Sequence, residues 1–271
     1  MSLPLVLIRG GGDLGSGVAF RLHKAGIPVI ISELPAPVCV RRLVCFSEAV
    51  YRQRITVEGI TGERCHSLAE VHSWLSRGCL PVLVDPSAPI ANELHPLVCV
   101  DARMRKAAPE FGRDDYPLTI GLGPGFTAGE NVHAVVETNR GPRMGRVFWQ
   151  GSTEADTGIP ERVQNYRIER VIRAPGDGIL QVIHDIGSRV SVEDPLAQVG
   201  EQTVKAAFDG IIRGMLHDGQ PVYAGMKIGD LDPRNDPSLC QMISDKALAV
   251  GGGVLEAILS RAGIRDQFYG H

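Results

Sequence analysis

Apolar runs alternate with helical patterns over the first 105 residues. Continuous apolar runs occur at 6–8, 29–31, 81–84 and 97–100, with a shorter candidate strand at 55–57. Between them, Val18, Leu22 and Ala25 are spaced for one buried helix face that ends at Gly26, and Ser67 with Glu70 forms a capping-box pattern for a helix over 68–77. Unbroken apolar strands are typical of a sheet covered on both faces. This alternation predicts an α/β fold with a Rossmann-like, parallel, doubly wound sheet over residues 1–105.

Residues 106–165 have a different pattern, with many glycines among β-branched residues and weak helical periodicity. Strands are expected at 118–122, 132–138 and 146–149, joined by glycine turns. We interpret this stretch as a glycine-rich β segment.

An internal repeat lies within a small all-β domain expected over residues 166–232. Residues 174–200 align with 206–232, and each copy has Asp-Gly-Ile followed by a glycine turn and a valine. Two copies suit one small barrel with pseudo-twofold symmetry. The pattern resembles the biotinyl/lipoyl-type barrel-sandwich hybrid, whose carriers present a modified lysine at a hairpin tip. Lys205 stands beside the second Asp-Gly motif instead, so we expect no biotin or lipoyl group and a structural or docking role.

The C-terminal segment, residues 233–271, begins with a loop rich in Pro, Asp and Asn. A helical pattern follows over 245–263, and Gly251-Gly252-Gly253 is expected to break it. One helix cannot fold alone, so this segment is expected to pack back on an earlier domain.

Composition narrows the function classes. The chain has 271 residues, 44% of them hydrophobic, and a formal net charge of −3. This charge does not favour nucleic acid or an anionic membrane as a partner. No apolar run approaches the roughly 20 residues of a membrane span, and the N-terminus does not resemble a signal peptide. The expected location is the cytoplasm, and the sequence leaves the oligomeric state open, a homo-oligomer included.

The first candidate site is the loop after the first strand. Gly10, Gly12 and Gly15 fit G-x-G-x-x-G in a strand–loop–helix context, and Glu33 ends the second strand 18 residues after Gly15. Such a loop exposes backbone N–H groups to a pyrophosphate, and an acid about 20 residues later binds a ribose hydroxyl and favours NAD. Asp13 is acidic where a phosphate would pass, so a helix cap in a loop that binds nothing stays an alternative.

The second candidate site is the "GLGPGF" loop, with Gly121, Gly123 and Gly125. Clustered glycines can form a nest of N–H groups for an anion, and His133, Glu137 and Arg140 follow closely. The alternative is a tight turn beside solvated arginines, the others being Arg143 and Arg146.

Other candidates are less specific. Asp85 and Asp101 end parallel strands, where they would contact a ligand or magnesium, or cap the following turns. Arg41-Arg42 lies within reach of a phosphate or is simply solvated. The six cysteines (39, 45, 65, 79, 99 and 240) form no C-x-x-C or zinc pattern, which favours reduced, mostly buried thiols. We predict no metal site and assign no catalytic residue.

Several stretches together resemble one protein family. They are "IRGGGDLGSGVAFRLHKAG", "VRRLVCFSEAVY", "VEGI", "VLVDPSAPI", "IGLGPGFTAGENVHAVVETNRG", "MGRVFWQG" and "IERVIRAPGDG". They resemble an accessory family of selenium-dependent molybdenum hydroxylases, over most of the chain from Leu5 to Leu259. The resemblance implies a role in maturing a xanthine-dehydrogenase-type client enzyme. The resemblance implies the maturation pathway in which the protein acts, and it identifies no catalytic residue.

Two functions remain open. In the first, the chain is a maturation factor that binds a nucleotide, NAD included, or another small anionic ligand, and docks its client through the barrel. In the second, it is an NAD-dependent oxidoreductase acting on a small metabolite.

Overall fold

The chain forms two compact units. The computed structural model describes residues 4–156, 158 and 162–270. The first unit comprises Met1–Pro37, Cys45–Asp156 and Ile243–His271, and the second comprises Val38–Val44 and Thr157–Met242. Each unit is described by itself.

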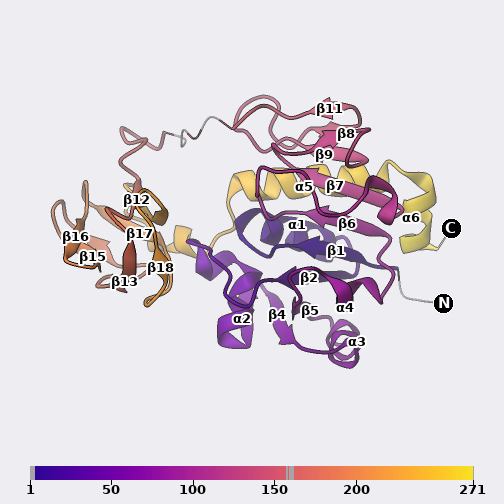
Figure 1. The fold of residues 1–271 in the computed structure, drawn as a ribbon, viewed down its shortest axis with the longest axis horizontal. Helices are drawn as coiled ribbons and strands as arrows, with labels where there is room; N and C mark the ends of the chain where they lie inside the picture. Colours follow the sequence, from indigo (N-terminus) through magenta and orange to yellow (C-terminus); the bar gives the residue numbers. More distant parts are fainter. Residues whose placement is uncertain (1–3, 157, 159–161, 271) are drawn as a thin grey trace. The chain divides into compact units, whose positions relative to one another are not determined.

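A nine-stranded sheet organises the described part of the first unit, in the order β10-β9-β7-β6-β1-β2-β5-β4-β3 (Figure 1). Neighbours from β9 to β4 pair in parallel, and β10 and β3 pair antiparallel at the two edges. The strands are β1 (Val6–Arg9), β2 (Val29–Glu33), β3 (Arg54–Val57), β4 (Ile60–Cys65), β5 (Leu80–Val84), β6 (Val98–Asp101), β7 (Leu118–Leu122), β9 (Ala134–Val136) and β10 (Val147–Phe148). A short antiparallel pair, β8 (Thr127–Ala128) and β11 (Gly151–Ser152), lies outside it. The predicted α/β class is therefore confirmed.

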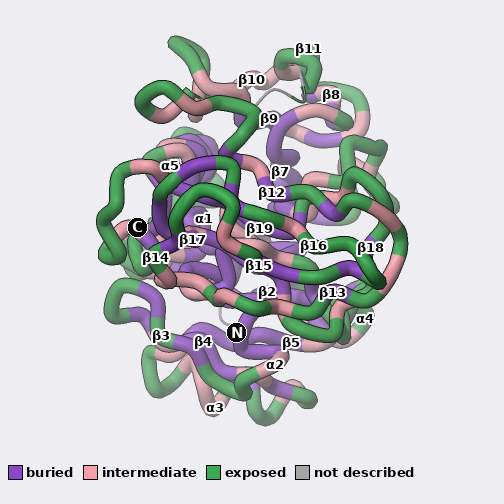
Figure 2. The backbone as a smooth tube through the Cα atoms, turned by 90° about the vertical axis from the view of Figure 1, so that its left-hand side faces the viewer, coloured by how far each residue is buried: buried purple, intermediate pink, exposed green. Residues whose placement is uncertain are grey.

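Helices cover both faces of the sheet, so its central strands are buried (Figure 2). Leu7, Ile30 and Leu83 belong to a core that also contains Val71 of α3 and Ala91 of α4. The other face is covered by α1, which contacts β1 and β2, and by α5, which contacts β7, β9 and β10. The helices are α1 (Asp13–Lys24), α2 (Ala49–Arg52), α3 (Leu68–Ser76), α4 (Pro89–Asn92), α5 (Asp245–Leu259) and α6 (Ala262–Tyr269), and the short 3₁₀ turns are η2 (Phe46–Glu48) and η3 (Arg113–Asp115).

The helix α3 begins as the sequence predicts. The Ser67 hydroxyl accepts a hydrogen bond from the Glu70 backbone N–H at 3.3 Å. The Glu70 carboxylate accepts one in return from the N–H of His66 at 2.6 Å, one residue before the N-cap. Both orphan N–H groups are thereby satisfied at the start of this helix.

The domain boundaries differ from those expected. The glycine-rich stretch that we placed at 106–165 is not separate, because β7 and β9 extend the parallel sheet of residues 1–105. Of the C-terminal segment that we placed at 233–271, residues 243–271 belong to this same first unit, whereas 233–242 belong to the second. The second unit also takes in residues 38–44, which lie within the stretch that we had assigned to the α/β domain.

The three glycines expected to break the C-terminal helix do not break it, because α5 runs continuously through them. A Cβ atom on Gly251 would lie 2.5 Å from the carbonyl oxygen of Gly17 in α1, and one on Gly253 would lie 2.2 Å from that of Gly145. Likewise, a Cβ on Gly17 would lie 2.4 Å from the carbonyl oxygen of Ala247. The glycines therefore permit backbone contact on two sides of α5, and this packing offsets their low helix propensity.

No single helix in the described part of the chain is long and apolar enough to span a membrane. One bent pair, Pro237–Leu259 with Ala262–Tyr269 at 96°, meets the criteria of length and composition only when taken together.

The second unit is built from two four-stranded antiparallel sheets within its described residues, β12-β19-β17-β14 and β16-β15-β13-β18. Their strands are β12 (Val171–Arg173), β13 (Gly178–Val182), β14 (Arg189–Val190), β15 (Pro195–Val199), β16 (Gln202–Lys205), β17 (Gly210–Met215), β18 (Pro221–Val222) and β19 (Lys227–Asp232), and its 3₁₀ turns are η1 (Arg42–Val44) and η4 (Pro237–Cys240). A continuous core that includes Leu180, Ile212 and Phe208 lies within this unit.

The two copies of the repeat exchange equivalent interactions. Strand β13 of the first copy pairs with β18 of the second, and β17 of the second pairs with β14 of the first. The Asp177 carboxylate accepts a hydrogen bond from the N–H of Ala224 at 2.8 Å, and the Asp209 carboxylate accepts one from Val192 at 2.7 Å. The repeated Asp-Gly motif therefore joins each copy to the other. Lys205 ends β16, where its ammonium group bonds Glu193 at 3.1 Å.

The glycines of α5 give a matched test of this packing. We expect Gly251→Ala to lower the free energy of unfolding by about 1–3 kcal/mol, because the added methyl group meets the backbone of α1. Gly252→Ala should raise it by up to about 1 kcal/mol, since a Cβ there meets no heavy atom within 4 Å and alanine favours the helix. Urea denaturation of both variants measures the difference. Equal effects of the two changes would contradict the close contact.

Candidate functional site

The glycines of the first loop have three distinct roles. Gly10 has φ +93°, a conformation that favours glycine. A Cβ on Gly15 would lie 2.0 Å from the carbonyl oxygen of Gly10, so only glycine lets α1 approach the loop. A Cβ on Gly12 would meet no heavy atom of the described chain within 4 Å, although its φ of −69° suits any residue. Gly12 therefore leaves one side of the loop open.

Hydrogen bonds at Gly11 fix the first loop to its neighbouring segments. The Gly11 carbonyl oxygen accepts from the Ser16 hydroxyl and from the Ser47 N–H, both at 2.9 Å. The Glu33 carboxylate accepts from the N–H of Gly11 at 2.6 Å and from that of Leu34 at 2.8 Å. The structure thus brings Glu33 to the loop, as its position after the second strand predicts.

Asp13 is the first residue of α1, and Gly12 is the N-cap. Gly12 has no side chain that could cap α1, and Asp13 places a carboxylate in the first turn of this helix. The partial positive charge of a helix N-terminus remains available there.

Lys246 is a charged neighbour of Asp13 that the sequence does not reveal. Both residues lie in the first turns of helices that pack along each other, α1 and α5. Burial lowers the pKa of Lys246, and nearby Arg140 lowers it further. The carboxylates of Asp13, Asp156 and Glu137 oppose this shift. Because 233 residues separate Asp13 from Lys246, no local motif could have revealed the pair.

The second glycine loop is filled by the protein itself. A Cβ on Gly121 would lie 2.2 Å from the Phe126 ring, and one on Gly123 would lie 2.4 Å from the Thr138 hydroxyl oxygen. A Cβ on Gly125 would lie 2.6 Å from the N atom of Ala107. Gly123 and Gly125 also have φ of +71° and +106°. These glycines serve a tight turn and close packing, which favours the structural alternative over an anion nest.

The polar residues around the second loop also have protein partners. Arg140 forms two hydrogen bonds with the Asp245 carboxylate, at 2.6 and 2.7 Å. Glu137 is fully buried and accepts from the N–H groups of Asn139 and Glu154 at 2.7 and 2.8 Å. His133 Nδ1 lies 2.8 Å from the Thr119 hydroxyl. The structure does not bring them together around an open anion site.

The aspartates at the strand ends accept hydrogen bonds from groups of the protein itself. Asp85 accepts a hydrogen bond from the N–H of Ala91 in α4 at 2.9 Å. Asp101 is bound by the Arg103 guanidinium at 3.0 and 2.5 Å. In the second unit, Arg42 donates to the Met215 carbonyl oxygen at 2.7 Å and Arg41 donates to that of Met242 at 2.7 Å. Neither Arg41 nor Arg42 belongs to the unit of the first loop.

The cysteines are free thiols, and four of the six are buried. Burial raises the pKa of Cys65 and of Cys99 to about 12, and it raises that of Cys240. These thiols stay protonated near neutral pH and are weak nucleophiles. Among the described residues, no group of three or more His, Cys, Asp or Glu side chains could hold a metal ion.

Comparison with known proteins identifies one curated relative of unassigned activity. No family model matches the chain. The uncharacterized protein YqeB of Escherichia coli (strain K12) is 46% identical over 255 residues, which cover 94% of this chain and 47% of YqeB. The chain therefore spans about half the length of this relative.

Solved structures show only a distant likeness. The product-bound ectoine utilization protein EutE (DoeB) from Ruegeria pomeroyi has a TM-score of 0.26 and 11% identity, over 85% of each chain. A succinylglutamate desuccinylase/aspartoacylase from Rhodobacter sphaeroides has a TM-score of 0.27 and 16% identity, over 87% of each chain. Values this low support no conclusion about fold or chemistry.

Glu33 gives this site a testable pH dependence. Burial raises its pKa above the ordinary value of 4.5, opposed by the hydrogen bonds from Leu34 and Gly11. A raised folded-state pKa stabilises the fold below the unfolded pKa, and this stabilisation is lost as the pH rises through the folded value. We therefore expect the stability of the native protein relative to Glu33→Gln to be greatest near pH 4 and to fall towards pH 8. Urea denaturation across this range measures it, and a relative stability that rises with pH would contradict the shift.

Proposed function

We propose that the first unit binds a nucleotide such as NAD at the loop from Gly10 to Gly15. The observation that carries the proposal is the open side of Gly12, between a glycine that turns the backbone and one that lets α1 approach. In dinucleotide-binding loops the second glycine lets the pyrophosphate approach the backbone, where the helix N-terminus attracts it. The charge of the nearby Lys246, which also interacts with Asp156 and Glu137, would weaken the repulsion between Asp13 and a phosphate.

The strand order supports this proposal. The parallel order β5-β2-β1-β6-β7-β9 corresponds to the Rossmann-like order 3-2-1-4-5-6. The order reverses between β1 and β6, which is the position where open α/β sheets bind ligands at the carboxyl ends of their strands. The first loop follows β1 directly. For the second unit, we propose a barrel-sandwich hybrid without biotin or lipoyl, on the exchanged pairing of its two repeats.

We further propose that the protein is a cytoplasmic accessory factor that matures a selenium-dependent molybdenum hydroxylase. The resemblance of the glycine loop and of residues 120–141 to that accessory family supports this role. The nucleotide site would bind a ligand that is used during maturation, and the second unit would dock the client enzyme. The raised pKa values of Cys65, Cys99 and Cys240 argue against selenium transfer through these thiols.

An NAD-dependent oxidoreductase is the second candidate. It is favoured by Glu33, which ends β2 and contacts the loop where a ribose-binding acid would stand. This candidate requires a change in nicotinamide absorbance with a hydroxy or amino acid substrate, which the accessory role does not.

Ligand-induced stabilisation tests the nucleotide site. We expect NAD, NADH, ATP, CTP or a molybdopterin nucleotide to raise the Tm of the full chain. A ligand at one hundred times its Kd adds about 2.7 kcal/mol to the free energy of unfolding. Gly12→Val should abolish this rise, because its side chain fills the open side of the loop.

Gly263→Val is the matched control, since Gly263 lies near the start of another helix and a Cβ there, as at Gly12, would meet nothing within 4 Å in the described chain. It should leave the rise in Tm intact. Absence of a rise with all five ligands, or an equal rise in the Gly12→Val protein, would contradict a site on this loop.

The accessory role has a cellular test. The test uses a host that has both this chain and a selenium-dependent molybdenum hydroxylase. Deletion of the gene for this chain should lower client activity at least tenfold, while the client polypeptide stays at its normal level. Complementation with the Gly263→Val chain should restore activity, and the Gly12→Val chain should not. Unchanged client activity in the deletion strain would exclude the role.

A further inference from the structure

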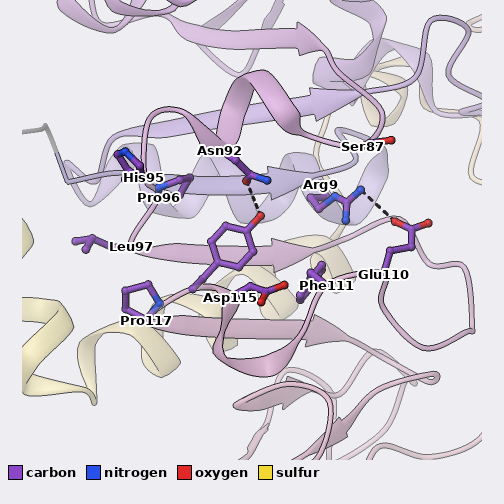
Figure 3. A pocket seen from close by; sticks show the side chains of 11 residues that line it. Arg9, Ser87, Asn92, His95, Pro96, Leu97, Glu110, Phe111, Asp115 and Pro117 are labelled. Atoms are coloured by element: carbon purple, nitrogen blue, oxygen red, sulfur yellow. Dashed lines mark hydrogen bonds and ion pairs between the residues drawn. The ribbon is translucent and has the colours of Figure 1, made fainter.

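A cavity of about 890 Å³ lies in the first unit beside the end of β1 (Figure 3). Its walls are partly apolar, with Leu97, Phe111 and Tyr116, and partly polar, with Arg9, Asn92 and Glu110. The rings of Phe111 and Tyr116 meet edge to face at 5.8 Å. Its size and mixed lining are typical of a small-molecule site.

Arg9 is a buried cation at this cavity. It ends β1, and the alternation of the strand places it on the same face as Leu5 and Leu7. The residue is 3% exposed, and its guanidinium donates to the Pro86 carbonyl oxygen at 2.9 Å. Its Nε is buried and has no hydrogen-bond partner in the described part of the chain. A buried arginine with an unused donor is costly to the fold unless a ligand or partner compensates it.

Three arginines donate hydrogen bonds to one carboxylate at this cavity. Glu110 accepts hydrogen bonds from Arg9 at 3.2 Å, from Arg103 at 2.7 Å and from Arg105. Its side chain is 51% exposed, whereas the Arg9 and Arg103 side chains are 4% and 16% exposed. Glu110 and Arg105, whose side chain is 47% exposed, are therefore the members of the cluster that reach solvent, whereas Arg9 and Arg103 are held within the fold.

The charge balance favours an anion in the place of Glu110. Three guanidinium groups face two carboxylates, since Asp101 is also bound by Arg103. Asp115 of the cavity wall adds a third carboxylate, so the charges balance while Glu110 is in place, and the departure of Glu110 leaves one positive charge uncompensated. Asp115, at another part of the cavity wall, has its carboxylate engaged by the Gly112 N–H at 2.7 Å.

We propose that this cavity binds a small oxyanion with an apolar body, a phosphate or carboxylate, whose anionic group displaces Glu110 from Arg9, Arg103 and Arg105. Arginine forks bind both groups through paired hydrogen bonds, and the rings of Phe111 and Tyr116 contact the apolar body. The cavity is lined by Arg9 and not by Gly12, but Arg103 of the cluster packs against Gly10 of the first loop, where a Cβ would lie 3.1 Å from the Arg103 Cγ. The site is therefore a neighbour of the first loop, and the inference does not require that a nucleotide binds there.

Calorimetric titration of the full chain with phenyl phosphate tests the inference. We expect Glu110→Gln to bind phenyl phosphate at least fivefold more tightly than the native chain, because the competing carboxylate loses its charge. Phenol should bind at least tenfold more weakly than phenyl phosphate. Glu93→Gln removes a charge from an exposed glutamate outside the cluster and should leave the affinity unchanged.

Loss of a cation should have the opposite effect. Arg9 is buried and its replacement endangers folding, so Arg105, whose side chain is 47% exposed, is changed instead. Arg105→Gln in the Glu110→Gln chain should weaken phenyl phosphate binding at least fivefold. Equal affinity of the native and Glu110→Gln chains, undetectable binding to both, or phenol binding as tightly as phenyl phosphate would overturn the inference.

Gly12→Val separates this site from the nucleotide site. The variant should keep the affinity for phenyl phosphate within twofold while it loses nucleotide-induced stabilisation. Loss of both responses in a variant with a native unfolding transition would show one shared site and overturn the inference of a separate one.

Discussion

The backbone-to-backbone approach of α1 is the constraint on which the first unit depends. Near the start of the helix, Gly15 lets it approach the carbonyl of Gly10, and two residues later Gly17 lets α5 approach α1. Any side chain larger than hydrogen at these two positions would force the elements apart. The same helix thus holds the loop against the sheet and fixes the start of α5, which brings Lys246 near Asp13.

This constraint explains why two similar glycine clusters have different uses. The first loop uses two of its glycines for packing and backbone conformation, which leaves Gly12 open on one side. In the second loop, the space beside each glycine is occupied by one other residue, which is Phe126, Thr138 or Ala107. A glycine count cannot distinguish the two loops, because the difference lies in which atoms from distant segments come close.

Local features of the fold could be predicted from the sequence, and non-local ones could not. The strand at 118–122 agrees with β7, and the helix after the first loop begins at Asp13 as expected, because their signals lie within a few residues. The continuity of α5 depends on Gly17 and Gly145, which are far away in sequence, so propensity alone gave the wrong break. Arg41 and Arg42 likewise follow β2 in sequence but are bound by carbonyl groups of the second unit.

Both anion-attracting regions of the first unit contain an acidic side chain of the protein itself. At the first loop, Asp13 lies at a helix N-terminus with Lys246 nearby, and beside β1, Glu110 lies among three arginines. Without these carboxylates, each region would hold more uncompensated positive charge. A carboxylate within the chain stabilises such a site while it stands empty, and it weakens binding by the free energy needed to displace or neutralise it. The two acids differ in mobility, since Asp13 is fixed in a helix and Glu110 is half exposed on a loop. The site at Glu110 is therefore suited to exchange its internal anion for an external one, whereas a ligand at the first loop would have to lie beside Asp13.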